Sequence, residues 1–70
     1  FDYDTAAQHI EHLLALQPKD VYGNLFRGSC RLLSGSDTVG GVADLDRAIS
    51  LAPKSADVRF LVADAYTYGL

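Results

Sequence analysis

Apolar residues recur at helical spacing in the first part of the chain, and a proline follows them. The apolar residues between positions 3 and 16 are Ala6, Ala7, Ile10, Leu13 and Leu14. Steps of three and four residues place such side chains on one face of a helix, here from Tyr3 to Leu16 with Asp2 or Asp4 as N-cap. Pro18 ends this helix, because proline lacks an amide donor and disfavours helical geometry in the residue before it.

A second helix is predicted from Val21 to about Leu33, and Asp20 is its expected N-cap. Its apolar residues include Leu25, Phe26, Leu32 and Leu33. The polar segment 34–37 follows, and Gly35 is suited to end the helix in a left-handed conformation. The sequence therefore predicts a loop between the second helix and a third.

The third helix is predicted from Thr38 or Val39 to Leu51, and the fourth from Ala56 to at least Tyr68. We expect Val42, Leu45, Ala48 and Ile49 to form the buried stripe of the third helix and Asp44, Asp46 and Arg47 to face outward. Ser55 is the expected N-cap of the fourth helix, whose residues available for packing are Phe60, Leu61, Val62, Ala65 and Tyr66. No segment shows the strict alternation of a half-buried strand. The expected fold class is all-α, an antiparallel helical-hairpin solenoid of about four helices.

The two halves of the chain repeat each other with a period of 35 residues. Pro18 and Pro53 (53 − 18 = 35) close matching phrases, Leu-Gln-Pro-Lys and Leu-Ala-Pro-Lys. The same offset pairs Ala6 with Gly41, Ile10 with Leu45, Leu14 with Ile49, Gly28 with Ala63, and Cys30 with Ala65. A period of ~20–50 residues is typical of solenoids, whose units bury their apolar faces against their neighbours.

In this register the chain resembles the tetratricopeptide repeat family, whose repeats are pairs of antiparallel helices with small residues at close-approach positions and a closing proline. The positions that carry the resemblance are Ala6, Pro18, Gly28, Gly41, Leu45, Ala48, Pro53, Ala63 and Tyr66. They fill half a repeat, one repeat and half a repeat over residues 1–70, a single domain. Asn24, Arg27 and Arg31 depart from the family's tryptophan, leucine and tyrosine. A related solenoid class with glycine-rich turns is the alternative, and the Leu-x-Pro phrase favours the tetratricopeptide class.

The resemblance implies a protein–protein interaction scaffold, whose concave groove holds a peptide or helix of a partner protein. The lining that it implies is Tyr22, Leu25, Ser29, Leu33, Phe60, Asp64 and Tyr68. Few of these side chains are charged, which suits an apolar segment. The alternative is that several of them pack against neighbouring repeats. The family's best-known groove clamps the carboxylate of an acidic chaperone tail with basic and amide side chains, which the matching positions here lack.

Composition narrows the class of partner. The chain has 70 residues, a net charge of −3, 49% hydrophobic residues and no methionine. An acidic balance without a basic cluster argues against nucleic acid, and no apolar run reaches the ~20 residues that span a membrane. We expect a piece of a longer protein. The only cysteine, Cys30, cannot form an intrachain disulfide, which fits a reducing compartment or a periplasmic stretch that needs no bridge. The cytoplasm is favoured, and no targeting segment is found within these residues.

Candidate chemistry is sparse. His9 and His12 share a helix face around Glu11, but zinc requires three or four ligands, so we expect no metal. Cys30 has no base beside it in the sequence and is expected to be a packing residue. We therefore expect no enzyme, no catalytic residue and no cofactor. Arg27 and Arg31 lie one turn apart and could pair with a carboxylate, either on a partner or on Asp64.

Two other functions remain open at this point. The first helix lacks its hairpin partner, and the last helix ends in apolar Tyr66, Tyr68 and Leu70 without a polar cap. Further repeats could supply the missing faces, or another copy could, by self-assembly into a homo-oligomer. Alternatively, the chain is a docking arm of a larger enzyme.

Overall fold

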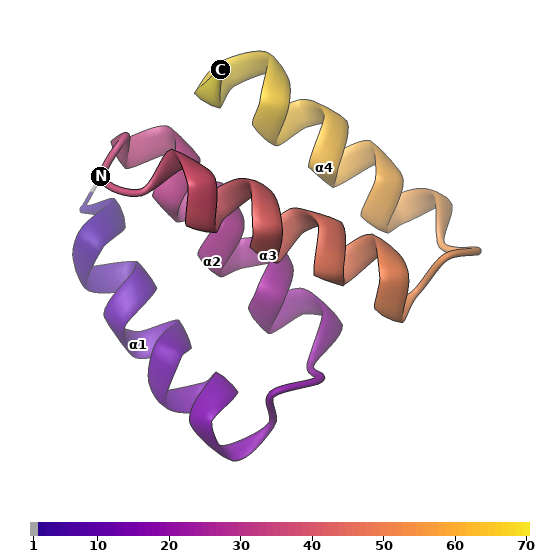
Figure 1. Ribbon diagram of the computed structural model, residues 1–70, viewed down its shortest axis with the longest axis horizontal. Helices are drawn as coiled ribbons and strands as arrows, with labels where there is room; N and C mark the ends of the chain where they lie inside the picture. The colour runs from indigo at the N-terminus through magenta and orange to yellow at the C-terminus, as the bar shows by residue number, and fades with distance from the viewer. Residues whose placement is uncertain (1) are drawn as a thin grey trace.

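The computed structural model describes residues 2–70 of the chain, which form four helices joined by short turns. They are α1 (Tyr3–Leu16), α2 (Val21–Ser34), α3 (Thr38–Leu51) and α4 (Ala56–Gly69), each of 14 residues. Consecutive helices run antiparallel, and α2 lies behind α3 and between α1 and α4 (Figure 1). Within residues 2–70 there is no strand. The predicted all-α hairpin fold is confirmed.

Each helix begins at a side chain that satisfies an otherwise unpaired backbone amide. The four N-caps are Asp2, Asp20, Asp37 and Ser55, and each side chain accepts a hydrogen bond from the amide three residues later. Hydrogen bonds from Thr5 lower the pKa of Asp2. The shortest of the four contacts joins the Asp20 carboxylate to the Gly23 amide at 2.6 Å. The caps expected at Asp20 and Ser55 are confirmed, and Asp2 rather than Asp4 caps α1.

Gly35 ends α2 in the left-handed conformation that the sequence predicts. Its φ is 72°, and its amide donates to the carbonyls of Arg31 and Leu32. This conformation suits glycine because a Cβ atom would clash with the backbone. It is the only positive φ among the described residues. The chain can therefore turn within three residues from α2 into α3.

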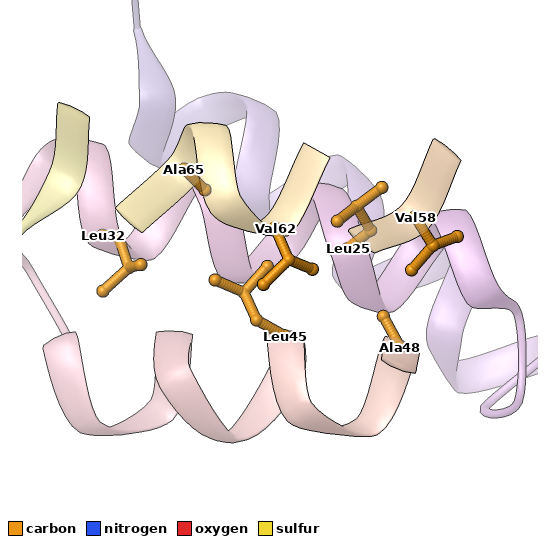
Figure 2. Close-up of a cluster of buried hydrophobic side chains, with 7 residues drawn as sticks. All are labelled: Leu25, Leu32, Leu45, Ala48, Val58, Val62 and Ala65. Atoms are coloured by element: carbon orange, nitrogen blue, oxygen red, sulfur yellow. The ribbon is translucent and has the colours of Figure 1, made fainter. Parts of the chain in front are cut away.

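The hydrophobic core gathers around α2, which contacts all three other helices. Its buried side chains come from α2, α3 and α4 and interdigitate between them (Figure 2). They are Leu25, Leu32, Leu45, Ala48, Val58, Val62 and Ala65. By contrast, α1 packs on α2 alone among the helices and buries only Leu14 fully. The centre of the fold is thus the three-helix unit α2–α3–α4, with α1 added on one side.

Two small residues allow α2 and α3 to approach closely. A Cβ atom on Gly28 would lie 2.8 Å from the carbonyl oxygen of Gly41 and 2.9 Å from the Cγ of Leu45. A Cβ atom on Gly41 would lie 3.0 Å from the carbonyl oxygen of Gly28. Backbone cannot give way as a flexible side chain can, so both positions require glycine at this helix spacing. Ala63 on α4 corresponds to Gly28 in the repeat. It is exposed, because no described helix covers that face of α4.

One expectation about α3 is wrong. Asp44 was expected to face outward with Asp46 and Arg47, yet it is only 2% exposed. Asp46 and Arg47 are exposed as expected. The Asp44 side chain points toward α2, where it accepts hydrogen bonds from Arg27 and Arg31. A polar cluster thus forms part of the contact between α2 and α3.

Candidate functional site

An apolar hollow lies on the surface between α2 and α4. Its volume is about 430 Å³, within the ~300–1,000 Å³ range of ligand-binding clefts. We call it the α2–α4 groove, lined by Tyr3, Leu25, Phe26, Ser29, Leu33, Leu61, Asp64, Ala65 and Tyr68. Most of its accessible lining is apolar, so water in the groove is poorly hydrogen-bonded and an apolar occupant would displace it favourably.

The lining repeats with the period of the sequence. Phe26, Ser29 and Leu33 on α2 correspond to Leu61, Asp64 and Tyr68 on α4, each pair 35 residues apart. On both helices these residues are spaced by three and four positions, which places them on one helix face. The same face of two equivalent helices therefore forms the two walls of the groove.

Large apolar side chains remain partly exposed along this lining. Phe26 is 49% exposed and Tyr68 is 75% exposed. The ring of Tyr22 stacks on that of Phe26 at a centroid distance of 6.0 Å. Because stacking restricts the rings of Tyr22 and Phe26, they lose little conformational entropy when a partner covers them. The rim of the groove thus presents aromatic side chains of restricted motion to a partner.

Leu25, Ser29, Leu33, Asp64 and Tyr68 are the groove residues expected from the sequence that line this hollow. Leu25 is 0% exposed and belongs to the core, so it forms the floor and offers no surface of its own. Tyr22 and Phe60 are exposed but lie outside the lining. Tyr3, Phe26, Leu61 and Ala65 also line the groove and were not predicted from the sequence. Phe26 and Leu61 are apolar residues 35 positions apart, and this repetition could have indicated that both face the groove.

The groove has few polar groups. The Ser29 hydroxyl donates to the carbonyl oxygen of Leu25 at 2.9 Å, which satisfies its proton within α2. Asp64 is the only charged side chain in the lining and is exposed. None of the described residues forms a hydrogen bond or ion pair with its carboxylate. The site is therefore apolar with one available negative charge.

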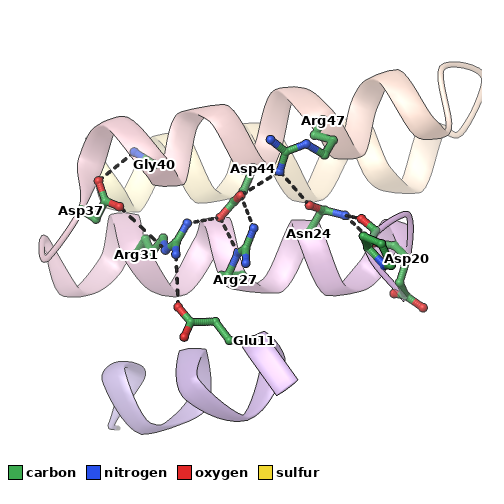
Figure 3. Close-up of polar contacts among 10 residues, drawn as sticks. Glu11, Asp20, Asn24, Arg27, Arg31, Asp37, Gly40, Asp44 and Arg47 are labelled. Atoms are coloured by element: carbon green, nitrogen blue, oxygen red, sulfur yellow. Dashed lines mark hydrogen bonds and ion pairs between the residues drawn. The ribbon is translucent and has the colours of Figure 1, made fainter. Parts of the chain in front are cut away.

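A second cluster lies away from the groove and centres on Asp44 (Figure 3). The Asp44 carboxylate accepts from the Nε and Nη2 of Arg27 at 2.9 and 2.8 Å and from the Nη1 of Arg31 at 2.8 Å. It also accepts from the Nη1 of Arg47 at 3.2 Å. The two-pronged contact with Arg27 is the strong geometry for an arginine–carboxylate pair. The hydrogen bond with Asp44 raises the pKa of Arg27 above its usual value, so its guanidinium stays charged.

Neighbouring polar groups complete the cluster. Asn24 is buried, donates to the carbonyl oxygens of Pro18 and Asp20, and accepts from Arg47 at 3.2 Å. Glu11 on α1 accepts from Arg31 at 3.2 Å. Asn24, Arg27 and Arg31 therefore belong to one network that joins α1, α2 and α3. The carboxylate that pairs with Arg27 and Arg31 is Asp44 of α3, and neither of the two partners considered from the sequence, Asp64 or a carboxylate of another protein, is needed to explain them.

The remaining candidates for chemistry are not brought together. His9 and His12 are exposed on α1. Among residues 2–70 no three His, Cys, Asp or Glu side chains form a group that could hold a metal. Burial raises the pKa of Cys30, which keeps the thiol protonated and poorly nucleophilic. Burial next to α3, together with the nearby Asp46 carboxylate, raises the pKa of Tyr66.

No helix in the described part of the chain has the length and apolar character needed to cross a membrane. Comparisons with protein families, with curated proteins and with solved structures found no match to this chain.

Proposed function

We propose that this chain is a protein–protein interaction module that holds an apolar peptide segment of a partner protein in the α2–α4 groove. The observation that carries this proposal is the lining, in which apolar side chains from two equivalent helices face one hollow. A peptide helix or extended segment with apolar anchors suits such a lining, because hydrophobic contacts supply most of the affinity in helix-in-groove recognition.

The helix bounds support a tetratricopeptide-like arrangement as part of the proposal. The offset between α1 and α3 is 35 residues at both ends (38 − 3 and 51 − 16), and the same offset relates α2 to α4 (56 − 21 and 69 − 34). In such an array the first helix of each repeat lines the groove. On this assignment α2 and α4 are those first helices, in agreement with the walls of the hollow.

The proposal is tested by panning a display library of random peptides of ~12 residues on the immobilised chain. A Phe26→Asp variant keeps the core intact, since Phe26 is half exposed, and places a charge in the groove. The matched control is Val39→Asp, which puts the same charge on an apolar side chain that is 83% exposed and outside the lining. Circular dichroism establishes first that both variants are helical.

We expect apolar peptides that bind the unmodified chain and the Val39→Asp variant and that lose at least roughly tenfold in affinity for Phe26→Asp, as truncation of an aromatic anchor generally does. Recovery of no specific peptide, or of peptides that bind all three proteins equally, would refute the groove as a docking site.

A second candidate function is self-assembly, and one observation favours it. Ile10 and Leu13 on α1 correspond to Leu45 and Ala48 on α3, which are fully buried against the rest of the core. Leu13 is nevertheless 42% exposed, and Ala63 on α4 is exposed where its counterpart on α2 is covered by α3. If α1 of one copy packed on α4 of another, it would repeat the contact between α2 and α3. Such head-to-tail contacts generate open chains or rings.

Light scattering during size exclusion tests this second function. Self-assembly predicts species larger than 7.6 kDa that grow with concentration and dissociate in a Leu13→Glu variant. The control Gln8→Glu alters an exposed residue of α1 outside that face and should leave the size unchanged. A strict monomer at high concentration would exclude this function.

A further inference from the structure

The one charge in the groove has no partner in the described part of the chain. Asp64 lies one turn before Tyr68 and next to Leu61 and Ala65, in the wall that α4 contributes. Its carboxylate is exposed to solvent and makes no ion pair there. In a groove selected only for apolar side chains, a carboxylate lowers affinity, because binding would remove it from water without compensation.

The lysine and arginine side chains of residues 2–70 all lie elsewhere. Three arginines are held by the Asp44 carboxylate, and the Arg59 guanidinium donates to the carbonyl oxygen of Pro53. The two lysines lie in the turns that follow α1 and α3. The six basic residues are Lys19, Arg27, Arg31, Arg47, Lys54 and Arg59. Among residues 2–70 no lysine or arginine is placed to neutralise Asp64, so a basic side chain of the occupant would supply the missing cation.

We infer that the occupant of the groove is a partner segment with a basic residue, arginine above lysine, between apolar anchors. This inference rests on the proposed docking function and adds the charge that the segment must carry. A basic side chain can lay its aliphatic stem along Leu61 and place its charged end at Asp64. The walls exclude part of the water, which strengthens the attraction between the two charges.

Arginine fits better than lysine for two reasons. Its planar guanidinium can form two parallel hydrogen bonds with the Asp64 carboxylate. The exposed ring of Tyr68, one helical turn away, offers an aromatic face on which the guanidinium can stack. The lysine ammonium is a point charge that cannot form two parallel hydrogen bonds with the carboxylate, and it stacks less well on an aromatic ring. An acidic segment would place like charges together and is excluded from the groove by repulsion.

The experiment measures the affinity of a recovered peptide and of its Arg→Lys and Arg→Gln versions for three proteins by fluorescence anisotropy. The proteins are the unmodified chain, Asp64→Asn, and the matched control Asp57→Asn. Asp57 lies two turns earlier on α4 and outside the lining. Asparagine keeps the size of the side chain and removes only its charge.

We expect the peptides recovered on the unmodified chain to be enriched in basic residues. The Arg→Gln change and the Asp64→Asn change should each weaken binding roughly tenfold, and the two together no further, as for a charge-assisted pair. The Arg→Lys change should have an intermediate effect, and Asp57→Asn should have none. Higher salt should weaken binding to the unmodified chain more than binding to Asp64→Asn.

The outcomes separate this inference from the docking function. Apolar peptides that lack basic residues, or that bind Asp64→Asn as tightly as the unmodified chain, would overturn the inference and leave the groove as a docking site. If no peptide depends on Phe26, the docking function itself fails, and this inference fails with it.

Discussion

At the scale of single residues, the polar cluster around Asp44 has the largest consequence for stability. One buried carboxylate accepts hydrogen bonds from three arginines, which come from α2 and α3. Removing one partner from such a set leaves a charge without a partner at a partly buried position. The loss of stability is then larger than the net contribution of the intact ion pair. Among the charged residues, Asp44 therefore contributes most to the packing of α2 against α3.

Asp44→Ala should lower the free energy of unfolding by about 2–3 kcal/mol. This value is below the ~3–5 kcal/mol for a fully buried pair because the arginines retain some contact with water. Urea unfolding followed by circular dichroism measures the change. The control Asp64→Asn, an exposed carboxylate without an ion pair, should change stability by less than ~0.5 kcal/mol. Equal stability of the two variants would show that the cluster is not structural.

The close approach of α2 and α3 gives a second prediction at this scale. Gly28→Ala should lower stability by about 1–3 kcal/mol, because its Cβ meets the backbone of Gly41 at 2.8 Å. Gly23→Ala on the same helix is the matched control. The three atoms nearest to its Cβ belong to the side chains of Leu14 and Asp20, the closest at 2.8 Å, so side chains and not backbone would have to shift. Equal stability of Gly28→Ala and Gly23→Ala in thermal unfolding would contradict the requirement for glycine at position 28 between α2 and α3.

At the scale of helices and turns, much of the architecture follows from local signals in the sequence. The bounds of α3 and α4 and the caps at Asp20, Gly35 and Ser55 were predictable, since capping and turn chemistry act within a few residues. The burial of Asp44 was missed because a charged side chain was taken to face outward, although Asp44 shares the helix face of Gly41, Leu45 and Ala48. Its partners lie 13 and 17 residues away in sequence (44 − 31 and 44 − 27), so only tertiary packing reveals them.

The turn between α2 and α3 offers a prediction about a single element. Gly35→Ala should lower stability by ~1 kcal/mol, because alanine disfavours a φ of 72°. Apart from Gly35 itself and its two chain neighbours, no atom lies within 4 Å of a Cβ built at that position, so the cost is confined to the local backbone. Gly35→Asn should cost less than Gly35→Ala, since asparagine tolerates the left-handed conformation. Chemical denaturation of the three proteins would show this order, and a reversed order would contradict the assignment of the cap.

At the scale of the whole molecule, α2 is the central helix, and it contributes to both the core and the groove. Its face toward α3 carries Gly28 and the arginines, while its face toward the groove carries Phe26, Ser29 and Leu33. The period of the sequence predicted that α2 and α4 would present equivalent faces. The period did not show which of the repeated residues form the floor of the α2–α4 groove and which form its walls. Leu25 and Phe60 are equivalent in sequence, yet Leu25 is fully buried and Phe60 is exposed, because the other three helices surround α2 while α4 lies at the edge.

The most direct test of the docking function is an amide NMR titration of the ¹⁵N-labelled chain with the tightest peptide recovered by panning. The account predicts that the largest shift changes occur on the two walls, at Phe26, Ser29, Leu33, Leu61, Asp64 and Tyr68. Amides on the exposed faces of α1 and α3, such as those of Leu16 and Val39, should move little. Largest changes at Leu16 or Val39, with the groove amides unmoved, would contradict the account.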